Sequence, residues 1–149
     1  VIIKFWNVFG IEKDMEKAHV ITDFIAKGFE TGVIDMMTDG TEEREFLYAE
    51  DCCEALETIM GCYDQFSSTD ELHITTGVST SILEIAQNIQ SLFKSIGKEI
   101  KISPSSSKDE VQKDARNIPD PYIRKWWTPK TTVVDGISKV FDEIKLEYL

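Results

Sequence analysis

Short strand-like runs alternate along the chain with amphipathic helix-like segments, and this alternation restricts the possible folds more than any other feature. The run Val1 to Asn7 is β-branched and aromatic and ends near Gly10, as a strand buried on both faces does. Ala18 to Glu30 follows with apolar residues at helical spacing. Four more strand-like runs are Gly32 to Met37, Arg44 to Tyr48, Glu71 to Thr76 and Ile100 to Ser103. The pattern predicts an α/β fold.

Helix and turn signals lie between these runs. Asp39-Gly40 is a turn dipeptide that joins the strands at 32–37 and 44–48. Ser81 and Glu84 have the spacing of a capping box at the start of a helix. Glu50 or Asp51 can accept hydrogen bonds from the free first-turn amides of the helix predicted at Asp51 to Tyr63. The three further helices are predicted at Asp51 to Tyr63, Ser81 to Ile96 and Thr132 to Leu146.

Charge excludes two classes of function. The chain carries 16 basic and 27 acidic side chains, a net charge of −11 at pH 7. A field of this sign repels phosphate backbones and anionic lipid, so neither nucleic acid nor a membrane surface is expected as a partner. The sequence has no signal-peptide pattern. It starts inside an apparent strand and without Met, which suggests a fragment of a longer protein.

The cysteines predict reduced thiols and a cytoplasmic protein. Cys52, Cys53 and Cys62 lie on one predicted helix and lack the spacings of a disulfide framework. The two histidines, His19 and His73, are far from them in the sequence. No metal site is therefore expected, and the cysteines are interpreted as buried small hydrophobic residues. Five residues of this helix are predicted to face the core: Cys52, Ala55, Leu56, Ile59 and Met60.

Motifs of catalysis are absent from the sequence. It has no glycine-rich loop that would hold phosphates. No Ser or Cys has an identifiable base partner. Arg44 stands out because it lies in an acidic stretch at the head of an apolar strand. Its guanidinium suits bidentate phosphate binding, and a local ion pair with Glu42 or Glu45 explains it nearly as well.

Four pieces of sequence occur in the order and spacing of one family. They are Phe5 to Gly10, Asp39 to Asp51, Thr75 to Gly77 with Ser81 to Ala86, and Trp127 to Lys130 with Asp135 to Ile137. Over essentially all 149 residues, the chain resembles the C-terminal half of an extended short-chain dehydrogenase/reductase, in the NAD-dependent nucleotide-sugar epimerase/dehydratase family.

The resemblance implies a division of labour. An N-terminal dinucleotide-binding half, absent from this sequence, would hold NAD or NADP and the catalytic Ser/Thr and Tyr-x-x-x-Lys set. The chain would be a single fragment, inactive alone and without catalytic residues. Residues 1–10 and 46–76 would be the last strands and a helix of a Rossmann-like doubly wound sheet. Residues 11–45 and 77–149 would mainly form a small α/β substrate-binding lobe.

The family also implies a function for the whole protein. The enzyme would bind a nucleotide-diphosphate sugar, oxidise the hexose C4 hydroxyl transiently with NAD(P), and then epimerise, dehydrate or reduce the 4-keto sugar. The fragment would supply binding energy from the nucleotide diphosphate, which orients the reacting sugar. A homo-oligomer is also implied.

Three candidate substrate-binding residues come from the first part of the chain. Asn7 falls on the family's strand-end asparagine, where an amide can donate to a diphosphate or sugar oxygen. A turn-forming asparagine is the alternative. His19 and Val20 fall where the family's substrate helix offers backbone amides to the pyrophosphate. Helix capping alone explains them equally well.

Three more candidates follow. Met37, with Met36, precedes Asp39-Gly40 on the strand that runs beside the nucleotide base in the family, although core packing explains methionines there as well. Arg44 falls on the family's diphosphate-binding arginine. The second arginine that the family has after the Pro104 loop is missing, and only Lys108 or Lys113 is nearby. A lysine supplies charge without a bidentate fork.

A rival hypothesis is a non-catalytic binding or interaction domain derived from the same fold. It is favoured by departures from the family at His73 and Thr75 and by the missing second arginine. Under either hypothesis, Val1 to Asn7 and Glu71 to Thr76 would lack neighbours in the sheet. Apolar strand edges would then make the chain self-associate or leave it marginally stable.

Overall fold

The structure, a computed structural model, describes residues 1–14, 17–110 and 118–148. The helices are α1 (Val20–Glu30), α2 (Ala49–Gly61), α3 (Ile82–Ser95) and α4 (Val133–Tyr148), with the 3-10 helices η2 (Tyr63–Gln65) and η3 (Pro121–Lys125). The strands are β1 (Ile2–Phe5), β2 (Val8–Phe9), β3 (Val33–Asp35), β4 (Glu43–Glu45), β5 (Leu47–Tyr48), β6 (Glu71–Ile74), β7 (Ser79–Ser81) and β8 (Lys101–Ser103). The α/β prediction is confirmed.

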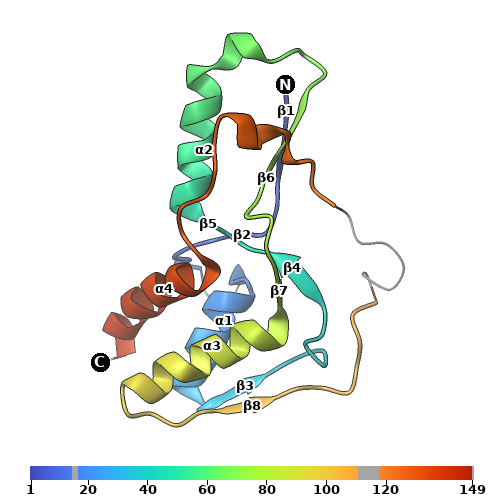
Figure 1. Ribbon diagram of the computed structural model, residues 1–149. Coiled ribbons are helices and arrows are strands. Elements are labelled where there is room, and N and C mark those ends of the chain that lie inside the picture. Colours follow the sequence, from blue (N-terminus) through green and yellow to red (C-terminus); the bar gives the residue numbers. More distant parts are fainter. Residues whose placement is uncertain (15–16, 111–117, 149) are drawn as a thin grey trace.

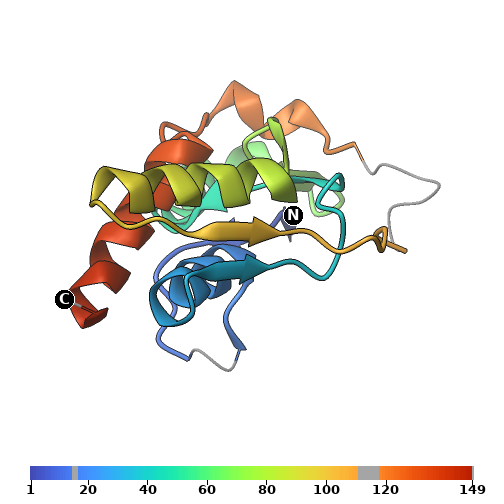
Figure 2. The same cartoon turned by 90° about the horizontal axis from the view of Figure 1, so that it is seen from below.

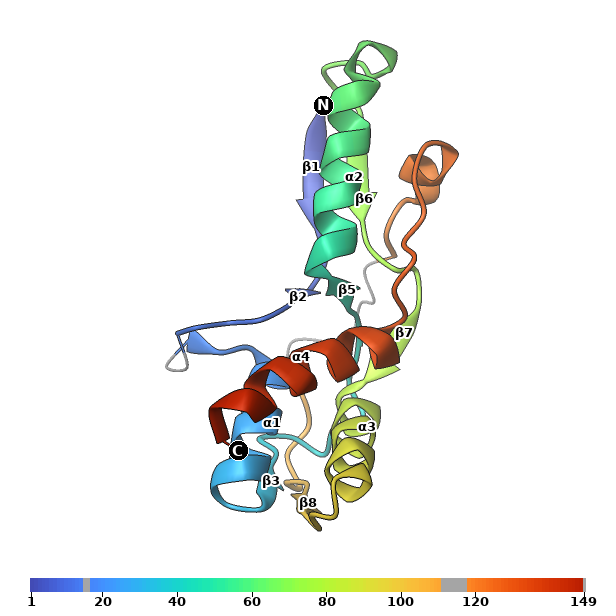
Figure 3. The same ribbon diagram turned by 90° about the vertical axis from the view of Figure 1, so that its left-hand side faces the viewer.

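The smaller of two hydrophobic cores lies beside a parallel pair of strands. β1 pairs with β6, with Ile2 opposite Glu71 and Phe5 opposite Ile74. Helix α2 runs along this pair, and η3 packs on β6 (Figures 1 and 3). Leu72 of β6 and Ala55 of α2 are fully buried between them. The predicted strands at the start of the chain and at Glu71 to Thr76 are therefore neighbours, a pairing that the sequence did not predict.

The larger core lies under the other three helices. Helices α1, α3 and α4 pack against one another, and the parallel pair β3–β8 lies along α1 and α3 (Figure 2). Phe93 of α3 is fully buried, 4.6 Å from the ring of Phe29 and 5.0 Å from that of Phe141. Helix α1 can approach α3 closely because Gly28 has no side chain. A Cβ atom at this position would lie 2.3 Å from the Phe93 ring.

Two short pairs of strands connect these regions. β2 pairs in parallel with β5, and β4 pairs antiparallel with β7. β7 and η3 were not predicted from the sequence. The three residues of β7 are all polar, so the strand shows no apolar alternation.

The first strand is not buried on both faces, contrary to prediction. Ile2 is 49% exposed and Phe5 is 53% exposed. The run is apolar enough for a central strand, but among the described residues it has a partner on one side only, β6. The other edge of β1 is open.

The turn at Asp39-Gly40 does not close a hairpin, although two strands joined across it were predicted. β3 pairs with β8 and β4 pairs with β7. Gly40 has a φ of 78°, and a Cβ there would lie 2.3 Å from Met36 Cε and 3.0 Å from the Leu83 amide nitrogen. Glycine is therefore needed here for two reasons: the turn has a positive φ, and the backbone lies close to the start of α3.

The capping box is confirmed, whereas part of the predicted face of α2 is wrong. Ser81 Oγ accepts from the Glu84 amide at 3.1 Å, and the Glu84 carboxylate accepts from the Ser81 amide at 2.8 Å.

In helix α2, Met60 was predicted to face the core but is 78% exposed. Cys52 is buried but Cys53 is exposed. One face of α2 meets the sheet. Met60 and Cys53 lie beside this face rather than on it.

Asp51 stabilises a distant loop rather than its own helix terminus. The side chain is 4% exposed, and Oδ2 accepts from the amides of Lys130 at 3.2 Å and Thr131 at 2.8 Å. Oδ1 accepts from the Thr131 hydroxyl at 3.3 Å. This carboxylate therefore holds the segment before α4 against α2.

Asp51→Ala is expected to lower the free energy of unfolding by about 2–3 kcal/mol, because two amides lose a charged acceptor. Asp51→Asn retains one acceptor oxygen and should cost less. Urea unfolding followed by circular dichroism measures both. A midpoint for Asp51→Ala equal to that of the wild type would contradict this role.

None of the described helices is long and apolar enough to cross a membrane.

Candidate functional site

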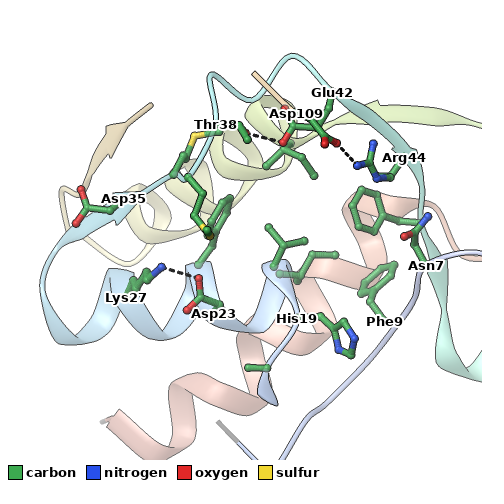
Figure 4. Close-up of a pocket in the computed structure, with 18 of the residues that line it drawn as sticks. Asn7, Phe9, His19, Asp23, Lys27, Asp35, Thr38, Glu42, Arg44 and Asp109 are labelled. Atoms are coloured by element: carbon green, nitrogen blue, oxygen red, sulfur yellow. Dashed lines mark hydrogen bonds and ion pairs between the residues drawn. The ribbon is translucent and has the colours of Figure 1, made fainter. Parts of the chain in front are cut away.

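A cavity of about 540 Å³ lies between α1, β3, the connection from β3 to β4, and the ends of β2 and β4 (Figure 4). Its inner wall is apolar. Charged and polar side chains stand around this apolar centre, as in many small-molecule sites. The apolar wall is formed mainly by Phe9, Phe24, Met36, Phe46 and Ile82.

The fold brings most of the candidate residues together at this cavity. Asn7 and Arg44 stand at one end of it, and α1 contributes its first residues (Figure 4). The cavity is lined by five of the six candidates: Asn7, His19, Val20, Met37 and Arg44. The two methionines differ, since Met36 is 6% exposed and Met37 is 89% exposed. Met36 is thus a core residue and Met37 is not.

Lys108 does not line this cavity. It is exposed, and its positive charge interacts with Asp39. Hydrogen bonds from Thr41, with a smaller contribution from the charge of Lys108, lower the pKa of Asp39. Lys113, the other cation considered, lies outside the described residues.

Arg44 is paired, but with neither of the two glutamates considered from the sequence. One terminal nitrogen donates to the Glu43 carbonyl at 3.0 Å, and the other forms an ion pair with Asp109. The side chains are 25% and 13% exposed, so the pair is largely shielded from water. Asp109 lies 65 residues further along the chain, and no sequence pattern pointed to it.

Asn7 combines a turn conformation with a place on the cavity wall. Its φ is 35°, in the left-handed region that asparagine tolerates. Its Nδ2 donates to the Glu45 carbonyl at 3.4 Å, and its own carbonyl accepts from the Leu47 amide at 3.2 Å. The residue therefore shapes the crossing from β1 to β2, as the turn-forming alternative requires, at the edge of the cavity.

The N-terminus of α1 already holds a carboxylate. The His19 amide donates to Glu12 Oε2 at 2.8 Å, and the His19 ring pairs with Glu12 Oε1. Burial raises the pKa of Glu12, but hydrogen bonds from His19 and Thr22 outweigh it and lower the pKa below its ordinary value. The cavity end of this helix thus binds an anion, in agreement with the positive end of the helix dipole.

Acidic groups outnumber basic ones around the cavity. Lys27 pairs with Asp23 at 2.7 Å. Thr38 Oγ1 donates to Glu42 Oε1 at 2.6 Å, and Glu42 Oε2 is buried without a hydrogen-bond partner. The arrangement can bind and orient a ligand that combines an apolar or flat group with an anion.

A second cavity of about 640 Å³ lies between the loop after β6, α3 and the segment before α4. Arg124 reaches it, donating to the Thr75 carbonyl at 2.7 Å and stacking over Trp127. Burial lowers the pKa of Arg124. None of the candidate residues lines this cavity.

Histidine, cysteine and carboxylate side chains do not gather into a group of three or more suited to a metal ion anywhere in residues 1–14, 17–110 and 118–148.

Comparison with known proteins identifies the family. The sequence profile of the NAD dependent epimerase/dehydratase family matches residues 1–74. A GDP-L-fucose synthase of Sinorhizobium fredii is 28% identical over 134 residues, which cover 87% of this chain. The chain belongs to the NAD dependent epimerase/dehydratase family. The match covers 41% of the fucose synthase, so this family member spans about two fifths of the length of that relative.

Solved structures of this family share the fold. An epimerase from Methanothermobacter thermautotrophicus superposes with a TM-score of 0.81 and 16% identity, over 98% of this chain and 43% of that one. UDP-glucose 4-epimerase from Thermotoga maritima, solved with UDP-glucose, gives a TM-score of 0.73 and 18% identity, over 97% of this chain and 45% of that one. This chain therefore has an α/β fold that resembles those of the two epimerases.

Proposed function

We propose that this chain is the nucleotide-sugar-binding C-terminal portion of an NAD(P)-dependent enzyme that acts on a nucleotide-diphosphate sugar through a transient 4-keto sugar. The family membership and the names of the relatives support this class of reaction. In this proposal, residues 1–10 and 46–76 are the last strands and a helix of a doubly wound sheet. Residues 11–45 and 77–149 mainly form the substrate lobe of a cytoplasmic homo-oligomer.

One observation carries the proposal: the cavity beside α1 joins an apolar wall to two groups that bind anions. Arg44 offers a guanidinium fork, which matches the oxygen geometry of a phosphate. The N-terminus of α1 offers the amide of His19, with Val20 next to it. Met37 and Phe24 offer apolar surface to a base or sugar ring on the same cavity.

In this proposal, these residues bind and orient the substrate. Binding energy from the diphosphate, remote from the reacting carbon, holds the sugar in position for chemistry performed by the rest of the enzyme. Asn7 lies at the same end of the cavity as Arg44. Its side-chain amide is the candidate group to orient the sugar. No catalytic residue is assigned to this chain.

The N-termini of α1, α2 and α3 offer no support for a dinucleotide site in the described residues. Helix α2 follows β5 directly with Tyr48 at its N-cap and has no glycine-rich turn before it. The N-terminus of α3 is closed by its capping box, and that of α1 holds Glu12. We therefore assign NAD or NADP to the part of the protein that would precede this chain.

A non-catalytic binding domain is the second candidate. It is favoured by the ion pair between Arg44 and Asp109, which leaves the arginine engaged within the chain. The two candidates differ in one result on the full-length protein. Turnover of a nucleotide sugar with NAD(P) is expected for the enzyme, whereas binding without turnover is expected for the alternative.

Calorimetric titration of the chain with UDP-, GDP-, ADP- and dTDP-linked sugars tests the proposed function. Saturable binding of at least one of them is expected, with NAD as the ligand that does not bind. Absence of binding by all four, in a chain that melts cooperatively, would contradict the proposed substrate lobe.

The open edge of β1 supports the proposal that the sheet continues in a preceding half. Ile2 and Phe5 are about half exposed, and unpaired strand edges template association with other chains. The chain alone is expected to self-associate at micromolar to millimolar concentration. Sedimentation velocity should show association that Ile2→Lys together with Phe5→Lys strongly reduces.

Leu146→Lys is the matched control for this prediction. Leu146 is 73% exposed and lies on α4, at the end of the molecule away from β1 (Figures 1 and 3). Its replacement should leave association unchanged. A monomer at all concentrations, or equal effects of both sets of substitutions, would contradict a role for the edge of β1.

A further inference from the structure

Asp109 is held in place against Arg44 by the backbone around it. The segment after β8 runs beside the segment after β3, with the Met36 amide donating to the Ser103 carbonyl at 3.0 Å. The Ser105 amide donates to the Thr38 carbonyl at 3.0 Å, and the Asp39 amide to the Ser107 carbonyl at 2.7 Å. These bonds extend the pairing of β3 and β8 toward the cavity and bring Asp109 to its wall.

The carboxylate of Asp109 occupies one terminal nitrogen of the Arg44 guanidinium at the cavity. The guanidinium donates through one terminal nitrogen to the Glu43 carbonyl and through the other to Asp109. Figure 4 shows Asp109 and Arg44 joined at one end of the cavity. A carboxylate presents the same kind of oxygen acceptors to a guanidinium as a phosphate does, so the two compete for one position.

Glu12 repeats this arrangement at the second anion-binding group. Its two oxygens contact the amide and the ring of His19, at the start of α1. Glu12 is half-buried and lies seven residues before His19, on the chain that leads into the helix. Both groups suited to bind the phosphates of a ligand therefore hold a carboxylate of the chain itself.

We propose that Asp109 and Glu12 are resident competitors for the anion-binding groups of the cavity, and that a diphosphate binds by displacing them. The inference rests on the proposed function, and it adds two residues that set the affinity of the cavity for a diphosphate. On displacement, the phosphate oxygens take the hydrogen bonds that the two carboxylates accept from Arg44 and His19. A neutral nucleoside has no phosphate to replace either carboxylate. Asp109 and Glu12 should therefore lower the affinity for a diphosphate and leave the affinity for a nucleoside unchanged.

Charge removal at the two positions tests the proposal. Calorimetry compares the wild-type chain with Asp109→Asn, Glu12→Gln and the double variant. The probes are UDP, GDP, inorganic pyrophosphate and, as neutral ligands, uridine and guanosine. Asp109→Asn is expected to tighten binding of UDP or GDP and of pyrophosphate about tenfold, with a smaller gain for the more exposed Glu12→Gln. Affinity for the nucleosides should not change.

Asp35→Asn is the matched control, because it removes one negative charge from the same cavity. Asp35 lies on β3, at the end of the cavity opposite Arg44 (Figure 4). It should raise diphosphate affinity far less than Asp109→Asn. Damage to the fold lowers affinity, so a rise cannot come from partial unfolding. Asp109→Ser serves as a second variant if Asp109→Asn melts early.

Each outcome separates this inference from the proposed function. Tighter diphosphate binding in Asp109→Asn but not in Asp35→Asn supports both. Tighter pyrophosphate binding without any binding of UDP or GDP supports the competitors and contradicts the nucleotide site. Equal affinities in the wild type and Asp109→Asn, or equal gains in Asp109→Asn and Asp35→Asn, overturn the inference. Absence of binding by every probe overturns both.

Discussion

Arg44→Ala is expected to weaken binding of a nucleoside diphosphate about 10- to 100-fold, because charged hydrogen bonds to phosphate contribute about 1.5–3 kcal/mol. The substitution also removes the ion pair with Arg44 from Asp109, whose side chain is 13% exposed. The negative charge of Asp109 then repels the ligand and adds to the loss. Calorimetric titration of the wild-type and variant chains measures the effect.

Two further variants separate these contributions. Arg44→Lys keeps the charge without the fork, and an intermediate affinity is expected. Arg44→Ala combined with Asp109→Asn also removes the negative charge of Asp109 and should recover part of the loss. An unchanged affinity in Arg44→Ala would show that the diphosphate binds elsewhere.

Phe93→Ala is expected to lower the free energy of unfolding by about 3–5 kcal/mol. The ring is fully buried where α1, α3 and α4 meet, and its loss leaves a cavity between three helices. For a domain of this size the melting temperature should fall by roughly 10 °C. Urea and thermal unfolding both measure the change, and Phe93→Leu should cost less than half as much.

Gly28 gives a sharper control for the packing of this ring. In the wild type, Gly28→Ala places a Cβ 2.3 Å from Phe93, so it should destabilise the fold. In the Phe93→Ala background the clash is gone, and alanine is favoured over glycine in a helix by about 1 kcal/mol. A change of sign between the two backgrounds is therefore expected. The same sign in both would contradict the helix contact described here.

The sequence predicted elements well where one local rule decides them. The capping box at Ser81 and Glu84, and the helical periodicities of α1, α3 and α4, are set by neighbours in the chain. The turn at Asp39-Gly40 was located for the same reason, but its strand partners were not. β3 and β4 find partners in β8 and β7, which lie far away in sequence, and no local pattern encodes this pairing.

Prediction of the site shows the same limit. The family resemblance selected Arg44, His19 and Met37, and the fold gathers them around one cavity. It did not find Asp109, because an acidic residue among 27 carries no signal of its own in the sequence. Only the pairing of β3 with β8 brings that carboxylate to Arg44.

Localising a bound ligand on the chain tests the central claim most directly. ¹⁵N-labelled protein is titrated with UDP-glucose and with GDP-L-fucose, and backbone amide and arginine Nε resonances are followed by NMR. The account predicts that at least one ligand perturbs Val20, Met37 and the side chain of Arg44, while Thr76 and the side chain of Arg124 at the second cavity remain unchanged. Perturbation confined to the second cavity, or none at saturating concentration of both ligands, would contradict it.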